Sequence, residues 1–319
     1  MRKHHLLGAI LLCGGLFSCS SEVIQQANYE IIPLPQEIKI STGNFVLNDR
    51  TSIVYPKGND EMQQNANLLA TYIRQMSGKK LKVIDEQITS NVITLTTGLN
   101  TDNAEAYQLK VTPDNIIIRG ASEAGTFYGI QTLRKSLPAT NKGDISLPGV
   151  EINDYPRFSY RGVHLDVSRH FFPIDSIKRF IDMMALHNIN RLHWHLTDDQ
   201  GWRIEIKKRP ELTTIGSKRS ATVIGHNSGE YDDVPYSGFY TQDEAKDIVR
   251  YAQERHITVI PEIDLPGHMQ AALAAYPELG CTGGPYEVWK MWGVSEDVLC
   301  AGNDKTLLFI EDVLSEMVD

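Results

Sequence analysis

Polar side chains that could do chemistry follow three strand-like runs in the second half of the chain. The runs cover residues 162–167, 190–196 and 257–263. Their polar clusters are Ser168-Arg169-His170, then Thr197-Asp198-Asp199-Gln200, and then Glu262, Asp264, Gly267 and His268. Because ligands bind beyond the carboxyl ends of parallel strands, we expect these side chains to share one site. Taken singly, each is more typical of a surface ion pair, a helix cap or a core histidine.

Two kinds of chemistry fit these clusters. His193 and His195 are one residue apart, so a strand places both imidazoles on one face, where a nearby aspartate would complete a site for zinc or another divalent ion. Alternatively, Arg169 and the carboxylates form donor and acceptor forks for a polyhydroxylated ligand. In that second interpretation Asp264 orients His268 across one turn. The residue types alone leave both interpretations open.

The elements that position these residues form two regions. Residues 29–154 predict a small α+β domain without a catalytic constellation. Its expected strands are 37–40, 45–47, 52–55, 92–95, 107–111 and 115–119, and its expected helices are 61–76 and 123–137. From residue 155 the pattern becomes strand–helix alternation, which predicts a parallel sheet in an open doubly wound fold or a barrel. The first strand is followed by no Gly-x-Gly-x-x-Gly, which argues against a dinucleotide fold.

Helix signals support the second region. Asp175 is predicted to cap a helix with Ile177, Phe180, Ile181 and Met184 on its inward face. Thr241-x-x-Glu244 predicts a capping box before a helix with Ala245, Ile248, Val249 and Ala252 on one face. Residues 305–318 predict a further helix.

The first 19 residues resemble an export signal. Arg2 and Lys3 precede an apolar run at 6–12 that is too short to span a bilayer. The Leu-x-Ser-Cys ending resembles a bacterial lipoprotein cleavage box, in which Cys19 would be acylated; an ordinary secretory signal is the alternative. We therefore expect an exported membrane lipoprotein with a signal at 1–19, a small domain at 20–154 and a second domain at 155–319.

Cysteine use and charge narrow the function further. After export, Cys281 and Cys300 would be the two remaining cysteines, and we expect them to form a disulfide, with two free thiols as the alternative. Acidic residues number 40 and basic residues 31, giving a net charge of −9. A nucleic-acid partner is not expected from such a chain.

Four segments resemble a known family. They are EAGTFYGIQTL (123–133), RGVHLDVSRHFF (161–172), NRLHWHLTDDQGWR (190–203) and PEIDLPGH (261–268). The last three closely resemble the family 20 glycoside hydrolases, the β-N-acetylhexosaminidases, and the first resembles the helix of that family's small domain. The resemblance implies an α/β fold, a (β/α)8 TIM barrel cut after about three strands and preceded by a small α+β domain. It also implies exo-acting hydrolysis of terminal N-acetylglucosamine or N-acetylgalactosamine, without a cofactor or metal.

The resemblance carries roles to individual residues. Arg169 matches the arginine that holds ring hydroxyls of the terminal sugar. Asp198 and His268 match two further active-site residues, Asp264 matches the aspartate near that histidine, and His195 would line the same pocket. The implied mechanism retains configuration: the substrate's acetamido oxygen attacks the anomeric carbon, an aspartate orients that group, and the adjacent glutamate protonates the leaving oxygen.

One family motif does not occur in these 319 residues. The His-x-Gly-Gly-Asp-Glu motif, which supplies the catalytic Asp-Glu pair, is absent from the sequence. We therefore expect the pair to lie beyond Asp319. The chain is then either a shortened part of a longer protein or a natural short product. We expect the chain by itself to be inactive. The segment 276–303 is either a rim of the sugar site or a satellite core of aromatic residues.

The sequence leaves three possible functions open. The first is a β-N-acetylhexosaminidase in its complete form. The second is a metal-dependent barrel hydrolase that uses His193 and His195. The third is a non-catalytic sugar-binding lipoprotein.

Overall fold

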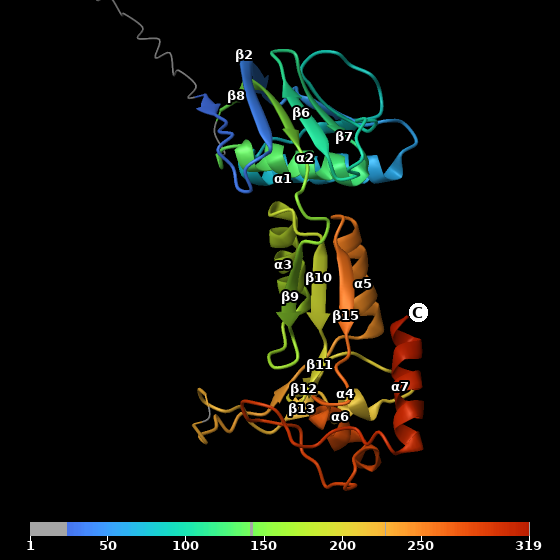
Figure 1. Cartoon of the computed structure of the whole chain (residues 1–319). Coiled ribbons are helices and arrows are strands. Elements are labelled where there is room, and N and C mark those ends of the chain that lie inside the picture. Colours follow the sequence, from blue (N-terminus) through green and yellow to red (C-terminus); the bar gives the residue numbers. More distant parts are fainter. Residues whose placement is uncertain (1–23, 141–142, 227, 319) are drawn as a thin grey trace, which may run out of the picture.

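Two regions stacked end to end make up the molecule (Figure 1). The computed structural model describes residues 24–140, 143–226 and 228–318. The predicted export signal and Cys19 lie outside the described residues. Within the described ranges, no helix is long and apolar enough to cross a membrane.

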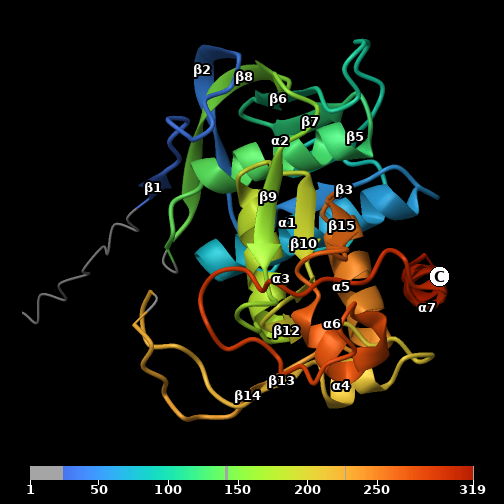
Figure 2. The same cartoon turned by 60° about the horizontal axis from the view of Figure 1, so that its bottom comes forward.

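The N-terminal region is a mixed sheet with two helices on one face (Figures 1 and 2). The strand order is β1-β8-β6-β7-β5-β3-β4, and β2 also pairs with β8. The strands are β1 (Gln25–Gln26), β2 (Glu37–Leu47), β3 (Ser52–Val54), β4 (Lys82–Ile84), β5 (Val92–Thr96), β6 (Tyr107–Val111), β7 (Asn115–Gly120) and β8 (Ile145–Asp154). The helices are α1 (Asp60–Ser77) and α2 (Glu123–Ser136). Apolar side chains between helices and sheet form the core, among them Ile93, Leu109, Ile118, Phe127 and Ile130.

The sequence predicted most of this region, although it did not predict the short strands β1 and β4, and two larger differences remain. The two strands expected at 37–40 and 45–47 are one strand, β2, whose register shifts between Ile40 and Asn44. Strand β8 was not predicted, although it pairs with both β2 and β6. Pro148 and Gly149 hide it, because both residues are depleted in strands unless a bulge accommodates them. The irregular stretch of β2 lies against them, and a Cβ at Gly149 would approach the Ser41 Oγ to 2.7 Å.

The second region is built on three parallel strands. Strands β9 (Gly162–Asp166), β10 (Arg191–His195) and β15 (Thr258–Glu262) lie in the order β15-β10-β9. Helices α3 (Ile174–Leu186) and α5 (Gln242–Gln253) flank these strands (Figure 1). The result is a small domain followed along the chain by a partial TIM-barrel-like region, which confirms the predicted fold class.

Shorter elements follow the carboxyl ends of these strands, at the bottom of Figure 1. They are β11 (Thr197–Asp198), β12 (Gly201–Trp202), α4 (Glu211–Thr214), β13 (Lys218–Arg219), β14 (Tyr236–Ser237), α6 (Gln270–Ala275) and the 3₁₀ helix η1 (Pro277–Leu279). The last described helix is α7 (Asp304–Met317), close to the predicted 305–318.

The helix signals have mixed outcomes. The capping box of Thr241 and Glu244 is present at the start of α5. The cap assigned to Asp175 is wrong, because Pro173 is the N-cap and Asp175 lies in the first turn, where its charge favours the helix dipole instead. Val249, which was predicted on the apolar face of α5, is 46% exposed. Its three predicted companions on α5 include Ile248 and Ala252, which are buried.

Polar contacts join the two regions. The Arg161 Nη1 donates to the Glu105 carboxylate at 2.7 Å, and the Asn190 Nδ2 donates to the same side chain at 2.9 Å. His256 lies 3.1 Å from the Asn65 Oδ1 and packs its ring on Phe127, with ring centroids 5.0 Å apart. Burial lowers the pKa of His256 to about 4, so this imidazole is neutral at pH 7. These contacts hold the amino ends of the three parallel strands against the N-terminal domain.

Candidate active site

One face of the three parallel strands carries imidazole and carboxylate groups. In the sheet register His193 lies opposite His164, and His195 lies opposite both Asp166 and Glu262. Since side chains alternate along a strand, the intervening Leu192 and Trp194 point the other way and are buried. The predicted convergence of the three strand ends is therefore present.

Asp198 is the centre of this site. It lies on the β11–β12 hairpin, and its side chain is completely buried. Its Oδ2 accepts from the Arg169 Nη2 at 2.6 Å and from the His195 Nε2 at 2.7 Å. Its Oδ1 accepts from the Asp199 backbone N–H at 2.7 Å and from the His268 Nδ1 at 3.1 Å. With donors on both oxygens, the buried carboxylate has the partners that a buried charge requires.

These donors determine the charge of Asp198. Burial alone would raise its pKa, but the hydrogen bonds from His195 and the Asp199 backbone, together with the charge of Arg169, outweigh burial and lower the pKa. Asp198 is therefore an anion across the neutral range.

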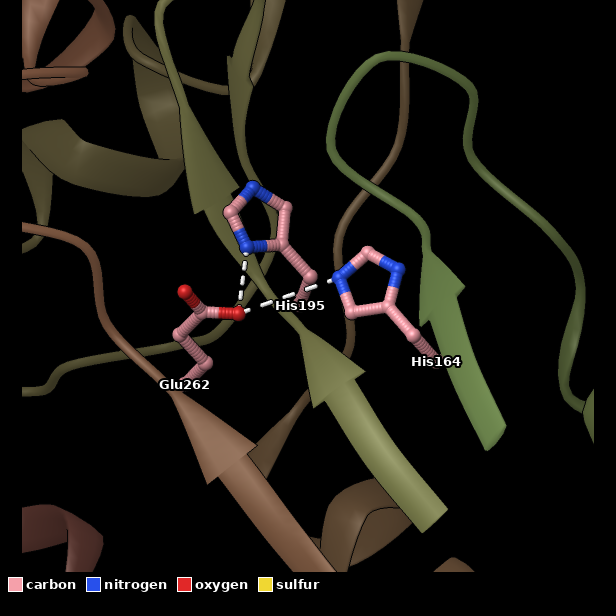
Figure 3. A group of neighbouring side chains, drawn as sticks. All are labelled: His164, His195 and Glu262. Carbon is pink, nitrogen blue, oxygen red and sulfur yellow. Dashed lines mark hydrogen bonds and ion pairs between the residues drawn. The ribbon is translucent and has the colours of Figure 1, made fainter. Parts of the chain in front are cut away.

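His195 links Asp198 to Glu262. Its Nδ1 donates to the Glu262 Oε2 at 2.7 Å (Figure 3). Its Nε2 donates to Asp198. Burial alone would lower the pKa of His195, but the hydrogen bonds to the two carboxylates outweigh it and raise the pKa to about 9. His195 is thus an imidazolium held on both nitrogens, which fixes the orientation of its ring.

Arg169 is the group of this cluster that reaches solvent. Its side chain is 41% exposed, and besides Asp198 it pairs with the Asp166 Oδ2 at 3.0 Å. The Gln200 Oε1 accepts from its Nε at 3.2 Å. Three fixed acceptors hold the planar guanidinium at the open end of the site, where it can present donors to ligand hydroxyls.

The proposed pairing of Asp264 with His268 is wrong. The Nδ1 of His268 contacts Asp198 at 3.1 Å, and His268 has a φ of 55°, so the segment is not a helical turn. The backbone N–H of Asp264 donates to the Thr197 Oγ1 at 3.1 Å, which places this aspartate beside the cluster. Burial, with the charges of Glu262 and Asp198, raises the pKa of the Asp264 carboxyl.

His193 and His164 approach the same oxygen of Glu262. The His193 Nε2 lies 2.5 Å and the His164 Nε2 3.9 Å from the Glu262 Oε2, and Figure 3 shows His164 and His195 facing Glu262 from neighbouring strands. Such a group of histidines and a carboxylate has the residue types of a metal site. However, two ligands of one tetrahedral zinc are about 3.4 Å apart. The contacts of His193 and His195 with Glu262 have hydrogen-bond lengths instead, so the structure favours a hydrogen-bonded network here.

Asp199 accepts hydrogen bonds from backbone N–H groups, whereas its neighbour Asp198 binds charged side chains. Its Oδ1 accepts from the Gln270 N–H at 3.1 Å and its Oδ2 from the Ser295 N–H at 3.0 Å. Its carbonyl oxygen accepts from the Trp289 N–H at 3.0 Å. The segment 276–303 is therefore attached directly to the loop that carries Asp198, as expected of a rim. The two tryptophans of the segment differ. Trp289 is half-buried, as a satellite core would require, whereas Trp292 is exposed, as a rim would require.

The predicted disulfide is not formed in the structure, in which Cys281 and Cys300 are free thiols. The two side chains are nonetheless neighbours. A hydrogen bond with Cys300 raises the pKa of the Cys281 thiol. Their pairing after export stays a prediction.

The family resemblance gave roles to five side chains of this site but none to Glu262, which was expected there only as one of the polar residues near the third strand end. The structure brings Arg169, His195, Asp198 and His268 together, with Asp264 beside them. The available signal for Glu262 was its position at the end of the third predicted strand.

Two sequence models of one family match the chain. The one described as "Glycosyl hydrolase family 20, domain 2" matches residues 28–155, and "Glycosyl hydrolase family 20, catalytic domain" matches residues 158–319. The chain belongs to glycosyl hydrolase family 20. All residues of the cluster around Asp198 lie in the part that matches the catalytic domain of this family.

Relatives of the chain are hexosaminidases by name. The Beta-hexosaminidase of Porphyromonas gingivalis is 43% identical over 332 residues, covering 99% of this chain and 41% of that protein. The Beta-hexosaminidase of Akkermansia muciniphila is 38% identical over 250 residues, covering 78% of this chain and 47% of that protein.

Solved structures share the fold. The beta-N-acetylhexosaminidase from Streptomyces coelicolor superposes with a TM-score of 0.80 at 35% identity, covering 90% of this chain and 56% of that one. A mutant Streptomyces plicatus beta-hexosaminidase, solved in complex with product (GlcNAc), also gives 0.80, at 36% identity, covering 90% of this chain and 56% of that one. The chain thus spans between 41% and 56% of the length of these four relatives.

Proposed function

We propose that the protein is an exo-acting β-N-acetylhexosaminidase that removes terminal N-acetylglucosamine or N-acetylgalactosamine from oligosaccharides or glycoconjugates. The observation that carries this proposal is the buried Asp198 anion, which holds Arg169, His195 and His268 at the common end of three strands. The names of the hexosaminidase relatives support it.

Each residue of the cluster has a binding or positioning role in this proposal. Arg169 donates to ring hydroxyls of the terminal sugar, with its fork fixed by Asp166 and Asp198. His268 presents its ring to the pocket while Asp198 holds its Nδ1. Asp198 and Glu262 together keep His195 charged and fixed, which preorganises the charges before substrate enters.

The proposed chemistry is substrate-assisted hydrolysis with retention of configuration. The acetamido oxygen of the substrate forms a bond to the anomeric carbon as the bond to the leaving oxygen breaks. Water then opens the oxazolinium intermediate. The roles of orienting the acetamido group and of protonating the leaving oxygen belong to the family's Asp-Glu pair, a motif that these 319 residues do not contain.

Two substrates test this function in the protein as its gene encodes it. We expect hydrolysis of 4-nitrophenyl N-acetyl-β-glucosaminide and no measurable hydrolysis of 4-nitrophenyl β-glucoside, which lacks the acetamido group. NMR of the first-formed sugar should show the β-anomer. Equal rates on the two substrates would contradict assistance by the acetamido group. Binding of N-acetylglucosamine without turnover would instead support the sugar-binding alternative.

The metal alternative has its own test. A hydrolase that depends on zinc at His193 and His195 loses activity in a chelator and regains it with zinc. We expect activity to be unchanged after dialysis against a chelator.

We also propose that the protein is exported and anchored in the membrane through a lipid on Cys19. The support is the signal-like sequence at 1–19. Metabolic labelling with a fatty acid should mark the wild type and not Cys19→Ser. Equal labelling of both proteins would reject the anchor.

A further inference from the structure

A cavity adjoins the exposed end of Arg169. Its volume is about 710 Å³, and its walls come from the segments 219–226 and 290–293 together with the loops that carry Arg169 and Gln200. The walls are tied together, because the Val223 N–H donates to the Lys290 carbonyl at 3.0 Å. The Gln200 Nε2 donates to the Met291 and Gly293 carbonyls at 3.2 and 3.3 Å. The cavity is therefore a built extension of the candidate site.

Cations outnumber anions in the lining of this cavity. Arg169, Arg219 and Lys290 line it, whereas Asp166 is its one carboxylate among the described residues. Asp166 is already paired with Arg169 at 3.0 Å. No carboxylate oxygen of the described chain lies within ion-pair distance of Arg219 or Lys290. Two cationic residues thus line the cavity without a counter-ion, and their charged groups lie over the rings of Tyr236 and Tyr231, at 4.2 Å for Arg219 and 5.3 Å for Lys290.

Arg219 is unusual among these cations because it is only 5% exposed. Its Nη1 donates to the carbonyls of Arg169 and Gln200 at 3.0 and 3.2 Å, and its Nε donates to the Thr222 Oγ1 at 3.1 Å. Its Nη2 has no hydrogen-bond acceptor in the part of the chain that the structure describes. A buried charge with an unused donor gains most from an anion that reaches it.

Arg203 shows what a purely structural arginine looks like in the same region. It is fully buried, and its three nitrogens all donate to backbone carbonyls, including those of Ser168 and Ser217. It does not line the cavity. Arg219 differs in that one terminal nitrogen remains unused beside an open space.

The nearest acidic influence on Arg219 does not fill this space. The charge of Asp232 acts on Arg219, but its carboxylate accepts from the Thr222 and Val234 N–H groups at 2.7 and 3.1 Å. Asp232 does not line the cavity.

An exposed aromatic surface completes the cavity. Trp292 is 59% exposed and contacts the ring of His226 edge to face, with centroids 4.8 Å apart. A rigid apolar face beside fixed cations suits a sugar ring that carries a negative charge.

We propose that this cavity binds an anionic substituent of the glycan, a sulfate ester or a carboxylate, through Arg219 and Lys290. The inference rests on the proposed hexosaminidase function and extends it by naming a substrate class. Its energetic basis is that the anion supplies the counter-ion that the lining lacks.

The test compares anionic and neutral substrates in the protein as its gene encodes it. One probe is 4-methylumbelliferyl N-acetyl-β-glucosaminide 6-sulfate against its unsulfated form, which places the charge on the terminal ring. The other is N-acetylglucosamine β-linked to glucuronate against the same sugar linked to glucose, which places a carboxylate on the next ring. For at least one pair, we expect kcat/KM to favour the anionic member about tenfold or more at low salt.

Variants locate the preference. Lys290→Gln and Arg219→Gln should each lower the anionic-to-neutral ratio of kcat/KM about tenfold. Lys218→Gln, on the neighbouring exposed lysine that does not line the cavity, should leave the ratio unchanged. Since Arg219→Gln removes contacts to two backbone carbonyls, Lys290→Gln decides the outcome if the former does not fold.

Two results would overturn the proposal. One is a wild-type ratio of one or less for both pairs, and the other is a ratio that Lys290→Gln does not change. If neither pair is hydrolysed, the hexosaminidase function fails, and calorimetry of N-acetylglucosamine 6-sulfate against N-acetylglucosamine then measures the same ratio as an affinity. Equal affinities in that experiment would reject the cavity's role independently.

Discussion

The strands of the two regions differ in the side chains that one face of each sheet carries. In the N-terminal region β5, β6 and β7 contribute Ile93, Leu109 and Ile118, all fully buried among other apolar groups. In the second region one face of β10 carries His193 and His195, although barrel interiors are usually filled with branched apolar residues. Local rules are typically broken where function requires it, and here the break marks the site.

Two aspartates, the half-buried Asp154 and the buried Asp198, show the same contrast. Asp154 in the N-terminal region accepts from the Tyr107 hydroxyl at 2.8 Å and the Gln36 N–H at 3.1 Å. Burial is the main influence on Asp154 and raises its pKa. Asp198 has charged donors, and its pKa is lowered instead. A carboxylate with neutral partners is a structural group, whereas one surrounded by cations organises a site.

The largest effect should come from removing the charge of Asp198. Asp198→Asn leaves Arg169 and His195 without their shared anion, and we expect a loss of about 3–5 kcal/mol in the free energy of unfolding. Asp154→Asn should cost about 1 kcal/mol, because its partners are neutral. Urea denaturation at pH 7 measures both.

The pH dependence of Asp198 follows from its lowered pKa. Its contribution to stability is present above the ordinary carboxyl pKa of about 4 and is lost as the pH falls below that value. At pH 7, equal losses in the free energy of unfolding for Asp198→Asn and Asp154→Asn would contradict the distinction between the two aspartates.

Substitution of Arg169 should give the next largest effect. Arg169→Ala removes two charge-assisted donors, so we expect kcat/KM to fall at least about 10²-fold. Arg169→Lys should recover little, because the planar fork is lost. Arg179→Ala, on the exposed face of α3, is the matched control. Near-normal turnover by both Arg169 variants, with normal folding, would take Arg169 out of the binding site.

Glu262→Gln tests the clamp on His195 at a smaller scale. The amide keeps the shape but not the charge, so the pKa of His195 should fall from about 9 toward its ordinary value of about 6.5. The stability that His195 contributes is present below pH 6.5 and is lost as the pH rises through 9 in the wild type; the variant should lose it at lower pH.

Histidine NMR titration and kcat/KM measure this effect, and we expect a fall of about tenfold in kcat/KM. Glu151→Gln, on β8 of the N-terminal sheet, should change neither quantity. A wild-type His195 that titrates near pH 6.5 would show that Glu262 does not hold it charged.

The smallest effect concerns His256, between the two regions. Because its pKa is lowered to about 4, it is neutral in the folded protein, and stability should decline as the pH falls from 6.5 to 4. His256→Asn, a residue tolerated at its φ of 55°, should reduce this decline by about 1–2 kcal/mol. Thermal melts of both proteins across this pH range measure the difference, and parallel curves would contradict it.

Periodicity and strand ends predicted the fold and most of the site because these signals are local. The alternation in 190–196 was enough to place both histidines of β10 on one face. The helix α1 was predicted from its apolar spacing and from Gly78, which adopts the left-handed C-cap conformation with a φ of 73°.

What the sequence missed depends on contacts between distant residues. Strand β8 contains a proline and a glycine that only the irregularity of β2 accommodates. The partner of His268 is Asp198, 70 residues away, rather than the nearby Asp264. The importance of Glu262 follows from the sheet register, which no local pattern specifies.

The attachment of the rim to Asp199 has a consequence for how such proteins diversify. Asp199 holds the segment through the backbone N–H of Ser295 on its carboxylate and through the Trp289 N–H on its own carbonyl. Every residue type except proline offers that N–H, so side chains at 289–295 can be exchanged without detaching the segment. The wall that carries Lys290 and Trp292 is thus free to acquire new ligand preferences by point mutation, while the neighbouring Asp198 keeps its place.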